Sequence, residues 1–238
     1  MLWHLSGASP KTGPSRELFN GSREYVSVEE AFIPKDQRVS RELVPEDHKA
    51  PLDFQEVFGN DHPVELEIGI GKGLFITHAG MHFPESNFIG IEIRRKYLNK
   101  ARERVEKRPL ANVRLICGEA FSFMEEYIPD ASLAAIHVYF PDPWPKKRHH
   151  KRRLFDPTFM KETFRALVPG GHLLIATDHA GYWEHIQEVL QHQEYLIPSE
   201  RLPEPPGKEE DLTNFEAKYK KEGRAIYRTG YRKPTEAP

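Results

Sequence analysis

The sequence predicts an α/β fold, a doubly wound parallel sheet with helices on both faces. From Val64 onward, short apolar runs alternate with longer segments of helical spacing. Such alternation is typical of right-handed β-α-β units, in which helices cover both faces of a parallel sheet. A glycine-rich turn directly after the first run supports the same fold, because ligands meet these sheets at the carboxyl ends of strands.

Five runs are predicted to be strands, because each is brief, β-branched or aromatic, and bounded by glycine, proline or charge. They are residues 64–68, 88–93, 113–117, 133–140 and 172–176. Helical spacing marks residues 74–82, 95–108, 157–167 and 181–191. We interpret Pro169-Gly170-Gly171 as a helix stop and turn, and residues 225–229 as a further strand near the end of the chain.

The composition predicts one globular domain that lies in the cytoplasm. The 238 residues are 38% hydrophobic, yet no run is long enough to span a membrane and residues 1–14 lack a signal-peptide core. The single Cys117 excludes an internal disulfide, and the twelve histidines show no ligand spacing, so no metal is expected. We expect residues 1–60 to be a partly flexible extension and residues 202–208 to be a linker.

The turn at residues 67–73 is a candidate ligand site. Gly69 and Gly71 let the backbone approach a ligand, and Glu92 ends the second strand about 20 residues on, where a carboxylate accepts hydrogen bonds from ribose. The glycine spacing departs from that of dinucleotide-binding proteins, and no phosphate-loop motif is present. Glu67 would repel a pyrophosphate but attract the ammonium and sulfonium charges of S-adenosylmethionine.

Glu119 follows the third predicted strand, where a carboxylate can accept from an adenine amino group. Taken alone, Glu119 fits an ordinary loop carboxylate better than an adenine contact. The glycines alone are likewise compatible with a plain strand-to-helix turn, and the two glutamates, Glu67 and Glu92, are what favour a cofactor site.

A proline-rich loop and a basic run follow the fourth predicted strand. Three prolines in residues 141–145 stiffen the loop around Asp142 and Trp144. Six cations then occupy residues 146–153 of a chain whose formal net charge is only −2. Basic and aromatic side chains at the substrate edge of a sheet favour RNA or DNA as the binding partner. Taken alone, the basic run is compatible with a solvated face, and Trp144 is compatible with a structural tryptophan.

Together these motifs resemble those of the bacterial tRNA (guanine-N7)-methyltransferases. The matching segments are residues 66–71, 90–92, 140–146, 148–149, 151–153, 176–178 and 213–216. They run in order and with similar spacing over about residues 63–228. The Pro-Asp-Pro-Trp loop with its basic run is the specific part, whereas the glycine turn identifies only the wider superfamily.

The resemblance implies a Rossmann-like methyltransferase sheet, mostly parallel and seven-stranded, with residues 61–238 as the methyltransferase domain. It implies transfer of a methyl group from S-adenosylmethionine to N7 of guanine 46 in the variable loop of tRNA. The expected partner is therefore tRNA, and the expected oligomeric state is a monomer or a homodimer.

Site residues follow from the resemblance position by position. The implied cofactor-binding residues are Glu67, Gly69, Gly71, Glu92, Glu119 and Asp142. The implied substrate-binding residues are Lys146, Asp178, Thr213, Asn214, Phe215 and Glu216. The implied RNA-binding residues are Arg148, His149, His150, Lys151, Arg152 and Arg153. Asp142 is also the implied catalytic residue, and we cast it as a positioner because guanine N7 carries a lone pair and no proton. Glu119 stands where many members of the family have aspartate, and residues 1–60 match no part of the family.

Three other functions remain open. A dinucleotide-dependent oxidoreductase would share the fold, and a methyltransferase of another RNA, a protein or a small molecule would share the cofactor turn. A non-catalytic RNA-binding module would use only the basic run.

Overall fold

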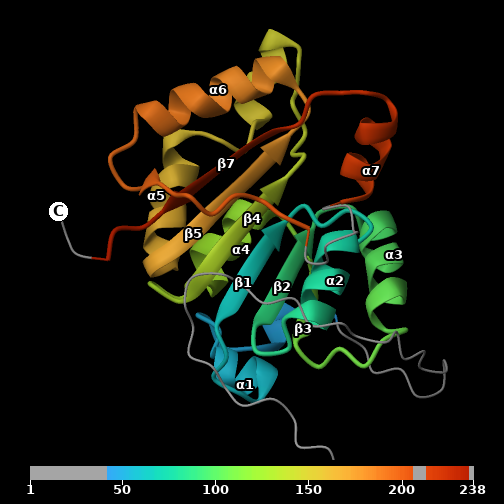
Figure 1. Cartoon of the computed structure of the whole chain (residues 1–238). Helices are drawn as coiled ribbons and strands as arrows, with labels where there is room; N and C mark the ends of the chain where they lie inside the picture. Colours follow the sequence, from blue (N-terminus) through green and yellow to red (C-terminus); the bar gives the residue numbers. More distant parts are fainter. Residues whose placement is uncertain (1–41, 206–212, 236–238) are drawn as a thin grey trace, which may run out of the picture.

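A computed structural model describes residues 42–205 and 213–235. A seven-stranded sheet of order β3-β2-β1-β4-β5-β7-β6 forms its centre (Figure 1). The strands are β1 (Val64–Ile68), β2 (Asn87–Glu92), β3 (Val113–Cys117), β4 (Leu133–Tyr139), β5 (Leu167–Thr177), β6 (Ile197–Pro198) and β7 (Tyr227–Arg232). Strands β1 to β5 pair in parallel, and β7 runs antiparallel to β5 and β6. The predicted α/β fold is confirmed.

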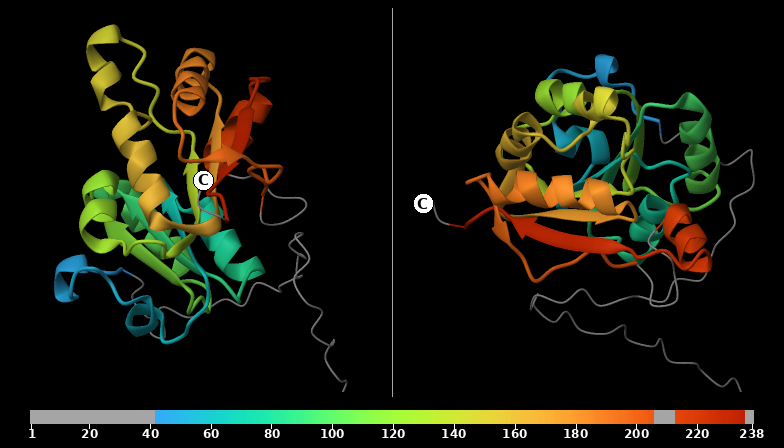
Figure 2. Two further views of the ribbon diagram at one scale, coloured as in Figure 1. Left: turned by 90° about the vertical axis from the view of Figure 1, so that its left-hand side faces the viewer. Right: turned by 90° about the horizontal axis from the view of Figure 1, so that it is seen from above.

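Helices cover both faces of the sheet, as the two views of Figure 2 show. They are α1 (Phe54–Phe58), α2 (Leu74–His82), α3 (Arg95–Val105), α4 (Ala120–Tyr127), α5 (Pro157–Ala166), α6 (Ala180–Gln191) and α7 (Asn214–Lys221). Successive strand residues face opposite sides, so neighbours such as Phe88 and Ile89 pack into different core clusters, one with α2 and α3 and the other with α1, α4, α5 and α6. None of the described helices is long and apolar enough to cross a membrane.

The predicted turn at residues 169–171 is instead an irregularity inside β5. Helix α5 ends at Ala166 and β5 begins at the next residue. Gly170 has a φ of 82°, and its N–H donates to the Lys233 carbonyl over 3.0 Å. The pairing register with β4 shifts between Leu133 and Ala135. A bulge that only glycine accommodates easily therefore replaces a chain reversal.

Three helices, α1, α4 and α7, were not predicted from the sequence, and each begins at a side-chain cap, which in α1 is Asp53. Glu119 accepts from the N–H groups of Phe121 and Ser122, and Thr213 accepts from those of Phe215 and Glu216. Thr-x-x-Glu is the sequence signature of a helix start, so residues 213–216 did carry a usable signal. The last strand also lies two to three residues later than predicted.

Residues 42–60 pack onto the domain. Leu43 and Leu52 are buried in the core, and the Leu43 N–H donates to the Leu115 carbonyl of β3 over 2.8 Å. Glu42 forms ion pairs with Arg95 and Arg102 of α3. This segment covers the otherwise unpaired edge of the sheet. Residues 1–41 of the predicted extension and residues 206–208 of the predicted linker lie outside the described residues, and the domain boundary at residue 60 stays a prediction.

Candidate active site at the carboxyl end of the sheet

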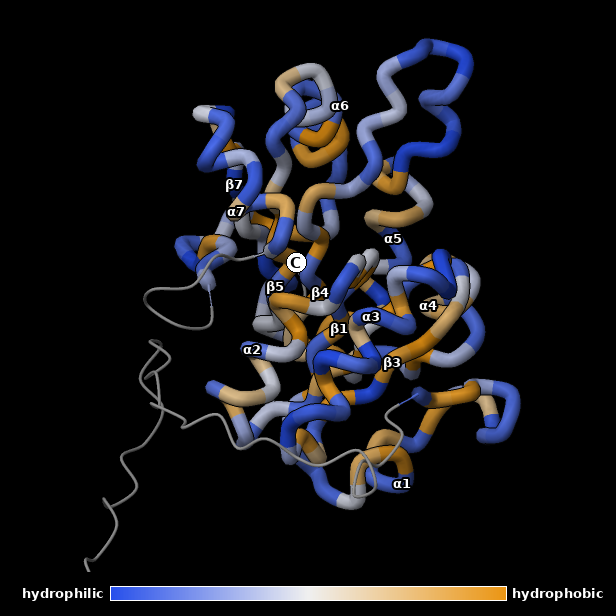
Figure 3. The backbone as a smooth tube through the Cα atoms, turned by 90° about the vertical axis from the view of Figure 1, so that its right-hand side faces the viewer, coloured by the Kyte–Doolittle hydropathy of each residue, from blue (hydrophilic) through white to orange (hydrophobic). Residues whose placement is uncertain are grey.

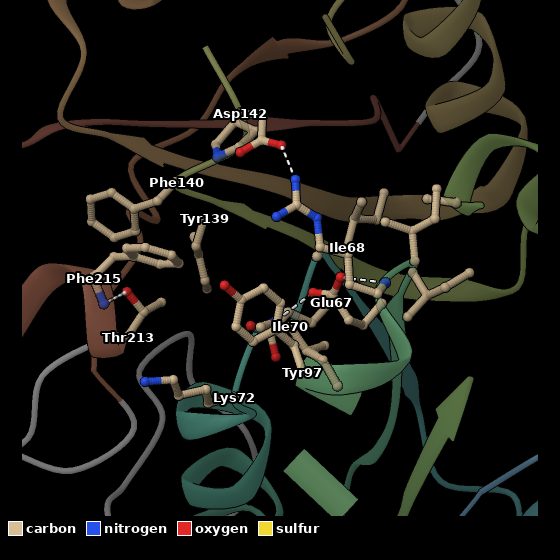
Figure 4. A pocket seen from close by; sticks show the side chains of 18 of the residues that line it. Glu67, Ile68, Ile70, Lys72, Tyr97, Tyr139, Phe140, Asp142, Thr213 and Phe215 are labelled. Carbon is tan, nitrogen blue, oxygen red and sulfur yellow. Dashed lines mark hydrogen bonds and ion pairs between the residues drawn. The ribbon is translucent and has the colours of Figure 1, made fainter. Parts of the chain in front are cut away.

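A cavity of about 460 Å³ opens at the carboxyl ends of the central strands (Figure 4). It lies beside the neighbouring strands β1 and β4, from which the chain continues in opposite directions along the sheet, to β2 and to β5. Open α/β sheets bind ligands at this position. Its volume falls in the range of about 300–1,000 Å³ that small-molecule sites occupy. The turn after β1, the start of α3, the loop after β4 and the start of α7 form its walls.

The glycine turn after β1 is tied to β2. Gly69 and Gly71 have φ values of 76° and 54°, which favour glycine. The N–H groups of Gly69 and Ile70 both donate to the Ile91 carbonyl of β2. Gly73, with a φ of 69°, is the N-cap of α2, and a side chain there would come within 2.7 Å of Ala101 Cβ in α3. The glycines therefore serve both the turn and the close approach of α2 to α3.

Glu67 is a buried carboxyl group beside this turn. It is 4% exposed, and its Oε2 has no hydrogen-bond partner among the described residues. Burial raises its pKa to about 8; the Ile76 N–H acts in the opposite direction, and the nearby Glu92 raises the pKa further. An unpaired buried carboxylate is costly unless a ligand supplies positive charge. Glu67 is therefore suited to a cationic ligand.

Two further carboxylates, from the ends of β2 and β3, line the same cavity. Glu92 accepts from the Gly71 N–H over 3.0 Å and from the Arg94 N–H over 2.8 Å, so it joins the glycine turn to the start of α3. Glu119 caps α4; burial opposes ionisation, but hydrogen bonds from Ser122 and Phe121 outweigh it and lower the Glu119 pKa. The cavity thus brings together the three glutamates that the sequence analysis singled out.

The proline loop after β4 forms the opposite wall with a strained backbone. Phe140 and Trp144 have φ values of 53° and 43°, uncommon for aromatic residues. The Arg153 Nε donates to the Pro143 carbonyl over 3.0 Å, and the Arg152 guanidinium lies 5.0 Å from the centre of the Trp144 ring. Strain of this kind persists where surrounding contacts fix it, commonly at functional sites. Here two arginines of the basic run supply those contacts.

Asp142 lies at the mouth of the cavity with 67% of its side chain exposed. Its ion-pair partner is Arg94, at 3.8 Å between Oδ2 and Nη2, and that side chain is 61% exposed (Figure 4). An exposed pair at this distance contributes little free energy. Asp142 can therefore exchange Arg94 for another partner at low cost.

The basic run forms a short 3-10 helix, Lys147–Arg152, ahead of α5. Figure 3 shows this segment as a hydrophilic loop that projects from the domain. Lys146, Arg148 and Lys151 are exposed, His149 and His150 are partly buried, and Arg153 lies over the Tyr182 ring. Lys146 does not line the cavity.

The segment at the start of α7 divides between the cavity and the core. Thr213, Asn214 and Phe215 line the cavity. Their implied role in substrate binding stays a prediction. Glu216 is fully buried instead, held by Arg228 of β7 at 2.5 Å and by Lys220 at 2.9 Å.

Asp178, the other carboxylate predicted to bind substrate, also lies outside the cavity lining. It pairs with Arg224 over 2.7 Å. The structure therefore gives Glu216 and Asp178 anchoring contacts near α7 and does not bring them into the cavity.

Several cavity residues escaped the sequence analysis. They are Ile93, Arg94, Tyr97, Tyr139 and Lys218. Ile93 and Arg94 directly follow Glu92 at a strand end, which was a usable signal. The others depend on which way a helix or strand residue faces.

Comparison with known proteins places this geometry in a family. The sequence profile of a family described as "Putative methyltransferase" matches residues 61–229. The tRNA (guanine-N(7)-)-methyltransferase of Rhodopirellula baltica is 42% identical over 79% of this chain and 73% of the relative, and that of Alkalilimnicola ehrlichii is 40% identical over 77% and 78%. An rRNA methylase from Streptococcus thermophilus shares the fold, with a TM-score of 0.51 at 13% identity over 74% of this chain and 89% of that chain. The resemblance noted in the sequence is confirmed, and the chain belongs to the tRNA (guanine-N(7)-)-methyltransferase family.

Proposed function

We propose that this protein transfers the methyl group of S-adenosylmethionine to N7 of guanine 46 in the variable loop of tRNA. The observation that carries the proposal is the arrangement of charge around one cavity. Its acidic floor consists of Glu67 and Glu92, and its basic rim consists of Arg94, Arg152 and Lys218. A cationic cofactor suits the floor, and a polyanionic substrate suits the rim. The family membership supports both assignments.

The residues of the floor fit S-adenosylmethionine, which when bound supplies an electrophilic methyl group on a cationic sulfur. The free Oε2 of Glu67 would receive positive charge from the ligand. Glu92 and Glu119 would accept hydrogen bonds from ribose and adenine through lone pairs that their backbone partners leave available. Gly69 and Gly71 would let the ligand approach the backbone.

Asp142 is proposed to position the guanine. N7 needs no general base, so the residues around the base have to orient it and stabilise the charge that develops on the ring. The guanine N1–H and amino group are both donors, and the exposed Asp142 carboxylate is an acceptor at the cavity mouth. Arg94 would release Asp142 to the base, and Trp144 offers a face on which an unstacked base can lie.

The exposed cations of the basic run are proposed to bind phosphates of tRNA. Lys146, Arg148 and Lys151 face solvent in the segment that follows the proline loop. Arg152 is also exposed, but it and Arg153 support that loop. We further propose a cytoplasmic location, in keeping with a tRNA substrate.

The test is methylation of an unmodified tRNA transcript with methyl-labelled S-adenosylmethionine, followed by borohydride reduction and aniline cleavage. We expect incorporation of label and cleavage at position 46, and neither in a transcript with adenine at that position. Labelling without cleavage would reassign the reaction to another atom, and no labelling would refute the proposal.

The Asp142→Ala variant tests the positioning role. Methylation should be abolished while cofactor affinity stays within about twofold, since we place Asp142 on the base. A larger loss of affinity would instead support the cofactor contact that the resemblance also implies for Asp142. Asp130→Ala is the matched control, because Asp130 is also an exposed, arginine-paired carboxylate but lies away from the cavity. An active Asp142→Ala enzyme would overturn the assignment.

A further inference from the structure

Three polar side chains form a buried hydrogen-bonded chain behind the cavity, and the proposed reaction does not use them. Glu65 and His137 are 1% exposed and Tyr139 is 5% exposed. His137 Nε2 lies 2.8 Å from Glu65 Oε2, and His137 Nδ1 lies 2.6 Å from the Tyr139 hydroxyl. A carboxylate only accepts, so Nε2 carries the proton, and Nδ1 of a neutral ring then accepts from the hydroxyl.

Strand alternation places this chain beside the acidic floor. Glu65 and Glu67 share one face of β1, and His137 and Tyr139 share the same face of β4. In the register of the two strands, the backbone of Glu67 lies opposite that of His137. Tyr139 is the last residue of β4 and lines the cavity. The hydrogen-bonded side chains of Glu65, His137 and Tyr139 therefore extend from the core to the cavity wall.

The Tyr139 ring is held in one position by contacts on several sides. The Phe75 ring lies edge-on to it, with 5.0 Å between centroids, and also packs on His137 at 4.7 Å. In the view of Figure 4, Tyr139 lies between Phe215 and Glu67. Burying a carboxylate and an imidazole is costly, so a chain of this kind stabilises a fold less than apolar packing would. Its effect is to fix where the aromatic ring stands.

We infer that Glu65 and His137 are positioning residues that hold the Tyr139 ring against the positively charged methionine portion of the cofactor. The inference rests on the proposed use of S-adenosylmethionine. Tyr139 lines the cavity on the same face of the sheet as Glu67, the carboxylate suited to positive charge, whereas Glu92 and Glu119 lie on the other side of β1 at the ends of β2 and β3. An aromatic face attracts a cation within about 6 Å, so the ring and Glu67 act on the same part of the ligand.

The first test is Tyr139→Phe, which keeps the ring and removes its bond to His137. Binding of S-adenosylmethionine, measured by calorimetry, should weaken about fivefold to tenfold, because a ring that has lost its bond to His137 leaves its binding position in most unliganded molecules and the ligand has to restore that position. Binding of 5′-methylthioadenosine, which lacks the methionine charges, should change by less than about twofold. In methylation assays the KM for the cofactor should rise while kcat stays nearly constant, because a saturating concentration of cofactor fills the site despite the weaker binding.

The second test compares two buried glutamates that both pair with basic side chains, Glu65 with His137 and Arg201, and Glu162 with Arg165. Glu65→Gln removes the charge behind His137; Glu162→Gln removes the charge that holds Arg165 on α5, away from the cavity. Both should lower the melting temperature, but only Glu65→Gln should weaken cofactor binding. If Glu65→Gln fails to fold, Tyr139→Phe decides the question.

Three results would overturn the inference. They are unchanged cofactor affinity in Tyr139→Phe, an equal loss for both ligands, and a matching loss of affinity in Glu162→Gln. Failure of the proposed function looks different, because the wild-type protein would then bind S-adenosylmethionine, with the pattern above, without methylating tRNA.

Discussion

The buried carboxyl group of Glu67 should make cofactor binding depend on pH. Burial raises its pKa from 4.5 to about 8, so at pH 7 only about one free molecule in eleven carries the ionised group. A cationic ligand stabilises the ionised form and displaces the proton. Binding should therefore release a proton at neutral pH, and the affinity should increase as the pH rises.

The magnitude follows from the linkage between protonation and binding. When only the ionised form binds, the Kd changes about tenfold per pH unit below the pKa and levels off above it. Between pH 6 and pH 8, the Kd for S-adenosylmethionine should fall about fiftyfold, or about 2 kcal/mol in binding free energy.

The assay is calorimetry in buffers of different ionisation enthalpy, which counts the protons released. The amino group of the ligand also titrates, so the quantity compared is the difference between wild type and Glu67→Gln, whose amide has the same shape but no charge to gain. The variant should lose the pH dependence that Glu67 contributes. Equal pH dependence in both proteins, or proton uptake by the wild type, would refute the reasoning.

The same pKa has an opposite effect on the free protein. Between pH 4.5 and about 8 the folded state holds a proton on Glu67 that the unfolded state has lost, so this group's contribution to stability is complete below pH 4.5 and disappears as the pH approaches 8. The full change is about 5 kcal/mol in the free energy of unfolding. In thermal melts without ligand, the melting temperature of Glu67→Gln relative to that of the wild type should increase as the pH rises.

Other contacts predict further effects on stability and RNA binding. Gly73→Ala should cost about 1–3 kcal/mol of unfolding free energy because the new methyl group clashes with α3; Gly59→Ala, with similar φ but open space, separates backbone strain from the clash. Glu216→Gln should loosen α7, detected as faster hydrogen exchange there, because two cations lose their buried partner. Replacing Arg148 and Lys151 by alanine should reduce the salt dependence of RNA binding by about 0.7 per lost phosphate contact, and an unchanged slope would remove them from the interface.

The fold was predictable where local sequence decides it. Strand β2 is buried on both faces and contains the apolar run Phe88 to Ile91, and α3 shows its buried stripe of Leu98, Ala101 and Val105. In β1 apolar residues alternate with Glu65 and Glu67, although all five residues are buried. Helices α4 and α7 have eight residues each and owe their starts to one capping side chain. A short helix stabilised mainly by tertiary packing leaves a weak periodic signal, which is why both were missed.

The site was predictable in part for a related reason. Glu67, Glu92 and Glu119 each stand at a strand end, and parallel strands end at one edge of the sheet, so local assignments were enough to bring them together. The role of Glu216 in α7 depends on Arg228, which belongs to strand β7, and no local sequence pattern predicts that pair. Arg153 likewise reads as a surface cation until the loop folds back onto it.

Glu67 and Asp142 differ in how much free energy a ligand can gain by pairing with them. Glu67 is buried with an unpaired oxygen and is mostly protonated at pH 7, so a cation in the cavity offsets the desolvation penalty of its ionised form. Asp142 is exposed and loosely paired with Arg94, so a base that replaces Arg94 gains little beyond its own hydrogen bonds. Cofactor affinity should therefore rest on the floor of the cavity and survive loss of Asp142. RNA affinity should come from phosphate contacts outside the cavity. Asp142 should therefore determine which base is methylated and contribute little to the affinity for tRNA.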